Sequence, residues 1–145
     1  MKRMEFTIPI NPVTKKNSQQ IVRNRDGRTF ITQNQRYKNY VASTALVLNA
    51  VRGREDIREP ISEPVNVRAH FYRSSRKIVD LTNLQECLHD VLVDAGILAD
   101  DSCRIIVSTD GSRVRYDHKN PRTEVVISPV LSSEDMKERE RMLPK

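Results

Sequence analysis

Side chains in the first half of the chain recur at the spacing of a helix. The positions that fall on one face are Tyr37, Val41, Thr44, Leu48 and Val51. Thr32 stands three residues before Gln35, which is the spacing of a capping box, and Gly53 is placed to end the helix. The pattern predicts a helix between these two signals.

A second helical stripe lies between Asp80 and Ala95 and is more strongly apolar. Its members are Leu81, Leu84, Leu88, Val91, Leu92 and Ala95. At about 100° per residue these side chains share one face, so we expect that face to pack on the core. Gly96 is expected to stop the helix.

Alternation with a period of two predicts the strands, and it is clearest at residues 65–72. Shorter strands are expected at residues 6–10, 21–25, 28–32, 103–109, 113–116 and 123–128. Pro9 confines the first of these to an edge or an end. Asp26-Gly27 predicts a two-residue hairpin turn in which both residues take positive φ, and Asp110-Gly111 predicts a second turn.

These elements fit one small α+β domain, because strands and helices interleave and several strands are expected to be linked as hairpins. The expected architecture is a mixed β-sheet packed with two main helices. A length of 145 residues also leaves little room for a second domain. We expect the domain to cover residues 1–131, and the highly charged residues 132–145 to form a solvated helix or a frayed tail.

The charge of the chain is unevenly distributed along it. Lys and Arg number 25 and Asp and Glu 19, which gives a formal charge of +6. Residues 80–110 hold seven acidic residues against Arg104, so that segment carries −6 and the rest of the chain +12. A basic protein with an acidic centre is typical of a metal-dependent enzyme acting on a polyanion, with nucleic acid favoured over a membrane surface.

Several classes of protein are disfavoured by the same inspection. The chain has no run of about 18 apolar residues, and its start lacks the apolar segment of a secretory signal. Cys87 and Cys103 are its only cysteines and are not spaced as a Cys-x-x-Cys pair, which disfavours a disulfide framework or a zinc site. We therefore expect a cytoplasmic protein.

Small basic clusters flank the acidic segment and are the candidates for DNA contacts. They are Lys15 and Lys16 in the first polar loop, and Arg73, Arg76 and Lys77 just before Asp80. Any one such cluster is usually a solvated loop, but together they favour phosphate contacts. Aromatic residues make up 5% of the chain and none is Trp, which favours recognition of the DNA backbone over a platform that stacks bases.

The acidic side chains of the second helix share one strip, in which Asp80 and Asp90 stand out as candidate functional residues. Asp80 could also be an ordinary N-cap, and the remaining acids a solvated face. Asp100-Asp101 follows the helix, and a return of the chain toward Asp80 could bring Asp101 beside it. Converging carboxylates repel unless they share a hard cation, and oxygen ligands favour Mg²⁺ or Mn²⁺. The expected chemistry is metal-assisted hydrolysis of a phosphodiester.

The chain resembles the RusA-type Holliday junction resolvases, a family typical of phages and prophages. The resemblance rests on Val79-Asp80-Leu81-Thr82-Asn83-Leu84-Gln85, on Asp90-Val91-Leu92, and on residues 95–101 ending in Asp100-Asp101. It spans roughly residues 6–128. It implies a homodimeric, Mg²⁺- or Mn²⁺-dependent endonuclease that nicks four-way DNA junctions symmetrically. Asp80 and Asp101 match the catalytic, metal-binding aspartates, Asp100 is the neighbour of Asp101, and Asp90 matches a helix aspartate of the family.

Two positions depart from the pattern of that family. Thr82 stands where a second aspartate is usual, and Glu86 where a lysine is usual. We hypothesise that Asp90 completes the carboxylate set, with Glu86 and Asp110 as alternatives. Lys15, Lys16 or Lys77 could replace the lysine.

The leading functional prediction is thus a junction-resolving endodeoxyribonuclease of DNA recombination and repair. The alternatives are a junction-binding protein with a degraded active site, and a metal nuclease for other branched DNA. A dimer interface could come from the first helix or from the sheet edge.

Overall fold

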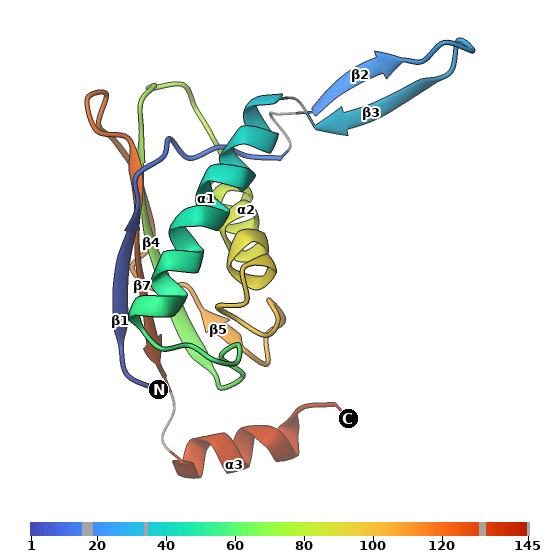
Figure 1. The fold of residues 1–145 in the computed structure, drawn as a ribbon. Helices are drawn as coiled ribbons and strands as arrows, with labels where there is room; N and C mark the ends of the chain where they lie inside the picture. The colour runs from blue at the N-terminus through green and yellow to red at the C-terminus, as the bar shows by residue number, and fades with distance from the viewer. Residues whose placement is uncertain (16–18, 34, 131–132, 145) are drawn as a thin grey trace.

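The fold is built on a mixed β-sheet with two helices on one face (Figure 1). The computed structural model describes residues 1–15, 19–33, 35–130 and 133–144. The sheet contains β1 (Met4–Ile8), β4 (Val65–Arg73), β5 (Ile106–Ser108), β6 (Arg113–Tyr116) and β7 (Arg122–Pro129). The helices on its face are α1 (Gln35–Arg54) and α2 (Leu81–Asp94).

Strand β4 organises the sheet, because it pairs with three of the other strands. Antiparallel β7 lies on one side of it and carries β1 at the sheet edge. On the other side β5 and β6 follow one another along β4, and both run parallel to it. The prediction of a mixed-sheet α+β domain is confirmed. The expectation that several strands are linked as hairpins is wrong for this sheet, because the strands that pair with one another in it are far apart in sequence.

The predicted turn at Asp110-Gly111 is present, but it joins two strands that run in the same direction. Gly111 takes a φ of 85°, and Asn66 of β4 holds the turn through the backbone N–H and C=O of Asp110. Strand β5 is shorter than expected, because residues 102–105 form a turn closed by the Ile105 and Ile106 amides on the carbonyl of Ser102.

The core lies between the sheet and the two helices. The alternation predicted for residues 65–72 is confirmed, with every second side chain from Val65 to Phe71 buried. The apolar stripe predicted for α2 faces these strands, and Leu84, Leu88 and Leu92 are each at most 1% exposed. Burial of a leucine side chain contributes about 1.5–3 kcal/mol, so this stripe fixes the position of α2 on the sheet.

A two-stranded hairpin, β2 (Gln19–Arg23) with β3 (Thr29–Gln33), projects from the body of the molecule (Figure 1). The predicted hairpin is thus confirmed, but the two-residue turn is wrong. Asn24 and Arg28 close a longer loop through backbone and side-chain hydrogen bonds, and of the central pair only Gly27 has positive φ. Thr32 belongs to β3 and α1 begins at Gln35, so Thr32 is not the predicted N-cap.

The charged C-terminal segment forms a helix, α3 (Ser133–Met142). Arg139 of this helix donates to the carbonyl of Cys103, and Arg104 donates to the carbonyl of Pro144. Among the described residues, no helix combines the length and apolar character needed to cross a bilayer.

Candidate active site

Asp80 is the residue that precedes α2, and its carboxylate does not cap that helix. Its backbone is extended, with φ −82° and ψ 128°, and no side-chain cap hydrogen bond is made. The carboxylate accepts one hydrogen bond from the Asn83 side chain, Nδ2 to Oδ2 at 3.2 Å, and the residue is exposed. An aspartate kept only as an N-cap would accept from a helix amide. The capping explanation therefore does not fit Asp80.

Asp100 and Asp101 follow the far end of α2 on an exposed segment. Gly96, with φ 75°, turns the chain, and the amides of Ile97 and Leu98 bond back to the carbonyl of Leu92. The Ser102 hydroxyl, followed by the neighbouring backbone amides, lowers the pKa of Asp100 below its ordinary value. This carboxylate is thus ionised at neutral pH.

Asp80 directly precedes α2, and the segment that carries Asp101 leaves the helix at its opposite end (Figure 1). Burial lowers the pKa of His89, and the charges of nearby Asp101 and Asp90 oppose part of that decrease. His89 is nine residues, or about 13 Å of helix, beyond Asp80. The return of Asp101 to the side of Asp80 stays a prediction, and the chain leaves α2 at the end opposite Asp80. Nowhere in the described part of the chain do three or more His, Cys, Asp or Glu residues form a group that could hold a metal ion.

Asp90 is held by a lysine from the N-terminal loop. Lys15 Nζ lies 2.9 Å from Asp90 Oδ2, where the two side chains are 43% and 28% exposed. This hydrogen bond is the largest cause of the raised pKa of Lys15, and Glu86 adds to it. Asp80 and Asp90 are ten residues apart on one helix, about 15 Å, so they cannot ligate one ion in the same chain. The hypothesis that Asp90 completes a metal set with Asp80 of its own chain is therefore corrected.

The buried side chains beside the Lys15–Asp90 pair include a tyrosine and a cysteine, and neither is ionised at neutral pH. Burial raises the pKa of Tyr37 and of the Cys87 thiol to about 12 each, so both stay protonated at neutral pH. Cys87 is buried and Cys103 exposed, and both are free thiols. Neither a reactive thiolate nor a tyrosinate is therefore present here at neutral pH.

Basic side chains gather at the end of the molecule where α2 begins. Arg73 ends β4, and Arg76 and Lys77 are exposed on the segment leading to Asp80. Arg36 and Arg73 line a crevice of about 40 Å³ together with Val79. Burial, and then the charge of Arg36, lower the pKa of Arg73. Two guanidinium groups that line one crevice favour an anion between them, and a phosphate group is an anion of this kind.

Arg36 is a candidate that the sequence pattern did not reveal. It lies on the first turn of α1, and nothing in the chain near it marks a basic cluster that includes Arg73. The signal is spatial, since the crevice joins residues 37 positions apart. Lys16, predicted together with Lys15 as a DNA contact, lies outside the described residues.

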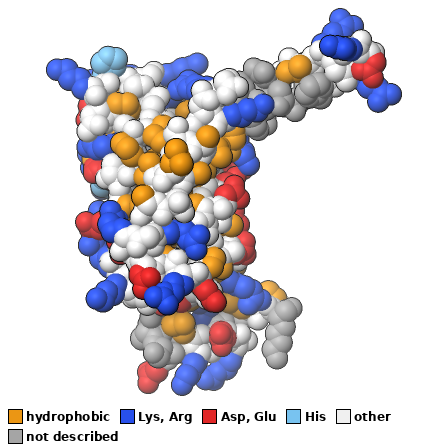
Figure 2. Space-filling model, in the orientation of Figure 1, with side chains coloured by type: hydrophobic (Ala, Val, Ile, Leu, Met, Phe, Trp, Pro, Cys, Tyr) orange, Lys and Arg blue, Asp and Glu red, His pale blue; other side chains and the backbone are white. Residues whose placement is uncertain are grey.

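The β2–β3 hairpin carries a second basic group at its tip. Arg23, Arg25 and Arg28 are exposed there, and Arg28 Nε lies 4.0 Å from Asp26 Oδ2. Figure 2 shows Lys or Arg side chains at the far end of the projecting arm. A two-stranded arm without further strands is marginally stable in water, so a binding partner would stabilise it.

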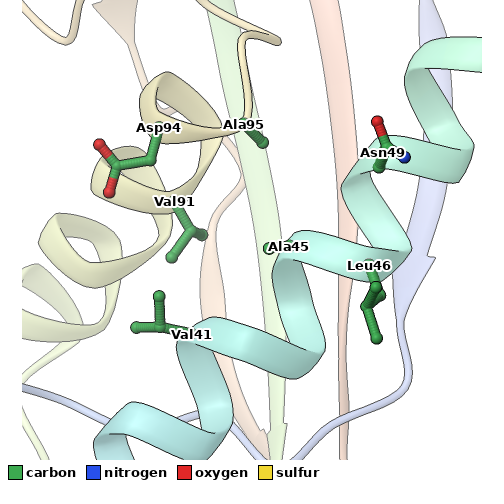
Figure 3. A pocket seen from close by; sticks show the side chains of 7 residues that line it. All are labelled: Val41, Ala45, Leu46, Asn49, Val91, Asp94 and Ala95. Carbon is green, nitrogen blue, oxygen red and sulfur yellow. The ribbon is translucent and has the colours of Figure 1, made fainter.

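An apolar groove of about 380 Å³ lies between α1 and α2 (Figure 3). Its lining residues are Val41, Ala45, Leu46 and Asn49 of α1, with Val91, Asp94 and Ala95 at the end of α2. Leu46 is 75% exposed, and Figure 2 shows apolar side chains gathered on this face of the molecule. The groove is thus an apolar surface on the first helix, one of the two places expected for a subunit contact.

Comparison with known proteins gives one family. The model of the family described as endodeoxyribonuclease RusA matches residues 9–128, which include Asp80, Asp90, Asp100 and Asp101. No curated protein matches the chain.

Proposed function

The chain belongs to the RusA endodeoxyribonuclease family, and from this premise we propose that it resolves four-way DNA junctions as a metal-dependent homodimer. The observation that carries the proposal is the position of Asp80. Its exposed carboxylate makes no cap hydrogen bond, and the residue directly follows Val79, which lines the crevice together with Arg36 and Arg73. A carboxylate that can bind a cation, next to groups that can hold phosphate, is the arrangement that phosphodiester hydrolysis needs.

The proposed metal ligands are Asp80 and Asp101, with Asp100 beside them. Their donors are carboxylate oxygens, which suit Mg²⁺ or Mn²⁺. A cation bound there supplies an activated water and neutralises charge on the phosphate oxygens. Because Asp80 precedes α2 and Asp101 follows its far end, we propose that two chains together assemble this pair.

A second copy of the chain would bring the two carboxylates together. If two α2 helices run antiparallel across a two-fold axis, Asp80 of one protomer lies near Asp101 of the other. The apolar groove between α1 and α2 offers a surface for this contact, with Leu46 exposed beside it. The same axis creates two equivalent sites, which match a two-fold symmetric junction and paired nicks.

We propose that two sets of basic side chains bind different parts of the junction. Arg36, Arg73 and Lys77 hold the phosphate next to Asp80, and the arginines of the hairpin tip reach a more distant part of the same duplex arm. Lys15 supplies positive charge against α2 at Glu86 and Asp90, and is the best placed of the described lysines to replace the one missing at position 86.

The experiment that tests this function offers purified protein a labelled four-way junction and a matched linear duplex, with and without Mg²⁺ or Mn²⁺. Paired metal-dependent nicks in the junction alone support the proposal. Binding without cleavage under either metal would favour the second candidate, a junction-binding protein without activity. Two observations favour that candidate: Thr82 stands where the family usually has an aspartate, and no group of three or more metal-binding side chains is found among the described residues. Equal cleavage of both substrates would favour a less specific nuclease for branched DNA.

A further inference from the structure

A hollow lined by apolar and basic side chains includes the residues directly before Asp80 in the chain. Its volume is about 430 Å³, and its lining residues come from residues 73–79 and from β6. The apolar members are Ile78, Val79, Val114 and Tyr116, and the basic members are Arg73, Arg76, Lys77 and Arg115. None of its lining residues is acidic.

The exposure of the apolar members is unusual for a solvated loop. Ile78 is 92% exposed, Tyr116 42% and Val114 39%. Single exposed apolar residues are ordinary on protein surfaces, but here three come together from two segments that are far apart in sequence. Such a patch rimmed by polar groups is typical of a binding surface.

The segment that carries Ile78 is held in place by hydrogen bonds at both ends. The Arg73 guanidinium donates to the Lys77 carbonyl, and the Lys77 amide donates to Ser75 Oγ at 3.1 Å. The Ser74 amide donates to Asn11 Oδ1 at 3.0 Å. Ile78 is therefore presented to solvent by an anchored segment and not by a freely moving one.

The hollow offers a flat stacking surface as well as charge. The Arg76 guanidinium lies over the Tyr116 ring, 4.2 Å from its centroid. Guanidinium and aromatic planes are the groups on which unpaired bases stack, and isoleucine is among the side chains that proteins insert between base steps. The four surrounding cations match the phosphates on either side of such a base.

We propose that this hollow binds a nucleobase unstacked from the branch point, with Ile78 inserted into the gap in the base stack. The inference rests on the proposed junction-resolving function and assigns a ligand to a part of the surface two residues from Asp80. A second copy of the same surface is a poor occupant, since it would bring four cations against four others. DNA supplies both the apolar base and the compensating charge.

The test uses four-way junctions that carry 2-aminopurine at each branch-point position, bound by saturating protein without divalent metal so that no strand is cut. Emission of 2-aminopurine rises when the base leaves its stack. The wild-type protein should raise the emission at one position of each symmetric pair. Ile78→Ala should lose most of that rise, and Ile78→Leu should retain it.

Met142→Ala is the matched control, because Met142 is also apolar and 79% exposed but lies on α3, away from the hollow. It should behave as wild type. Tight junction binding with no emission rise at any position would overturn the inference and leave the proposed function standing. A full rise with Ile78→Ala would also overturn it, as would loss of the dimer in that variant, which would assign Ile78 to a subunit contact. Failure of the wild type to bind junctions at all would overturn both proposals.

Discussion

The ion pair between Lys15 and Asp90 should stabilise the fold, and the Asp90 carboxylate itself should not be required for catalysis. The perturbation is a double-mutant cycle made of Lys15→Met, Asp90→Asn and the two together. At the observed 2.9 Å, two unit charges attract by about 1.4 kcal/mol in a water-like dielectric. Because the side chains are 43% and 28% exposed, screening and the ordering of the lysine offset part of this, which leaves a coupling free energy of about 0.5–1 kcal/mol. For a chain of this length that corresponds to roughly 1–4 °C in Tm.

The dependence of this coupling on pH follows from the raised pKa of Lys15. The folded state binds the lysine proton more tightly than the unfolded state does, so the contribution to stability is complete below the ordinary lysine pKa. It is lost as pH rises through the higher folded value. Urea unfolding of the four proteins at pH 8, and again above pH 11, measures both effects. The same proteins should be assayed for metal-dependent nicking, which Asp90→Asn should retain.

Two results would refute this reasoning. A coupling indistinguishable from zero at pH 8 would mean that the contact contributes nothing to stability. Loss of nicking by Asp90→Asn at unchanged stability, alongside loss by Asp80→Asn, would return Asp90 to the catalytic set.

Three further predictions concern the basic tip of the β2–β3 hairpin, the groove between α1 and α2, and the core. Replacing Arg23, Arg25 and Arg28 together by Ala should reduce the slope of log K against log salt for junction binding by up to about 2.7, and an unchanged slope would exclude the arm from DNA contact. Leu46→Glu, at a side chain 75% exposed, should leave the fold intact but prevent dimerisation and cleavage, and a dimer persisting in sedimentation would contradict this. Leu88→Ala, at a side chain 0% exposed, should lower the free energy of unfolding by about 2–5 kcal/mol in urea titrations, and a loss well below 1 kcal/mol would show that α2 does not depend on this contact.

The sequence was sufficient to predict the elements whose side chains alternate or recur around a buried face. Strand β4 and helix α2 are examples, because burial on the sheet is what fixes their periodicity. It could not predict how β5 and β6 are arranged. Both pair in parallel along β4, and that pairing depends on hydrogen bonds between segments that local patterns do not connect.

The sequence could identify candidate residues of the site, but it could not predict how those residues are arranged in space. Asp80 stands out by its position before α2, but its distance from Asp101 depends on where the chain goes after Gly96. Two features of the site join residues that are far apart in sequence: Lys15 pairs with Asp90, and Arg36 lines one crevice with Arg73. Spacing along the sequence therefore could not predict either of them.

The most direct test of the proposed function mixes two inactive variants, Asp80→Asn and Asp101→Asn, and measures metal-dependent nicking of a four-way junction. If each active site takes Asp80 from one protomer and Asp101 from its partner, a mixed dimer has one intact site and one site lacking both carboxylates. Nicking of one strand per junction should then return on mixing, although each variant alone is inactive. If mixing restores no cleavage while sedimentation shows that mixed dimers form, the composite site is contradicted.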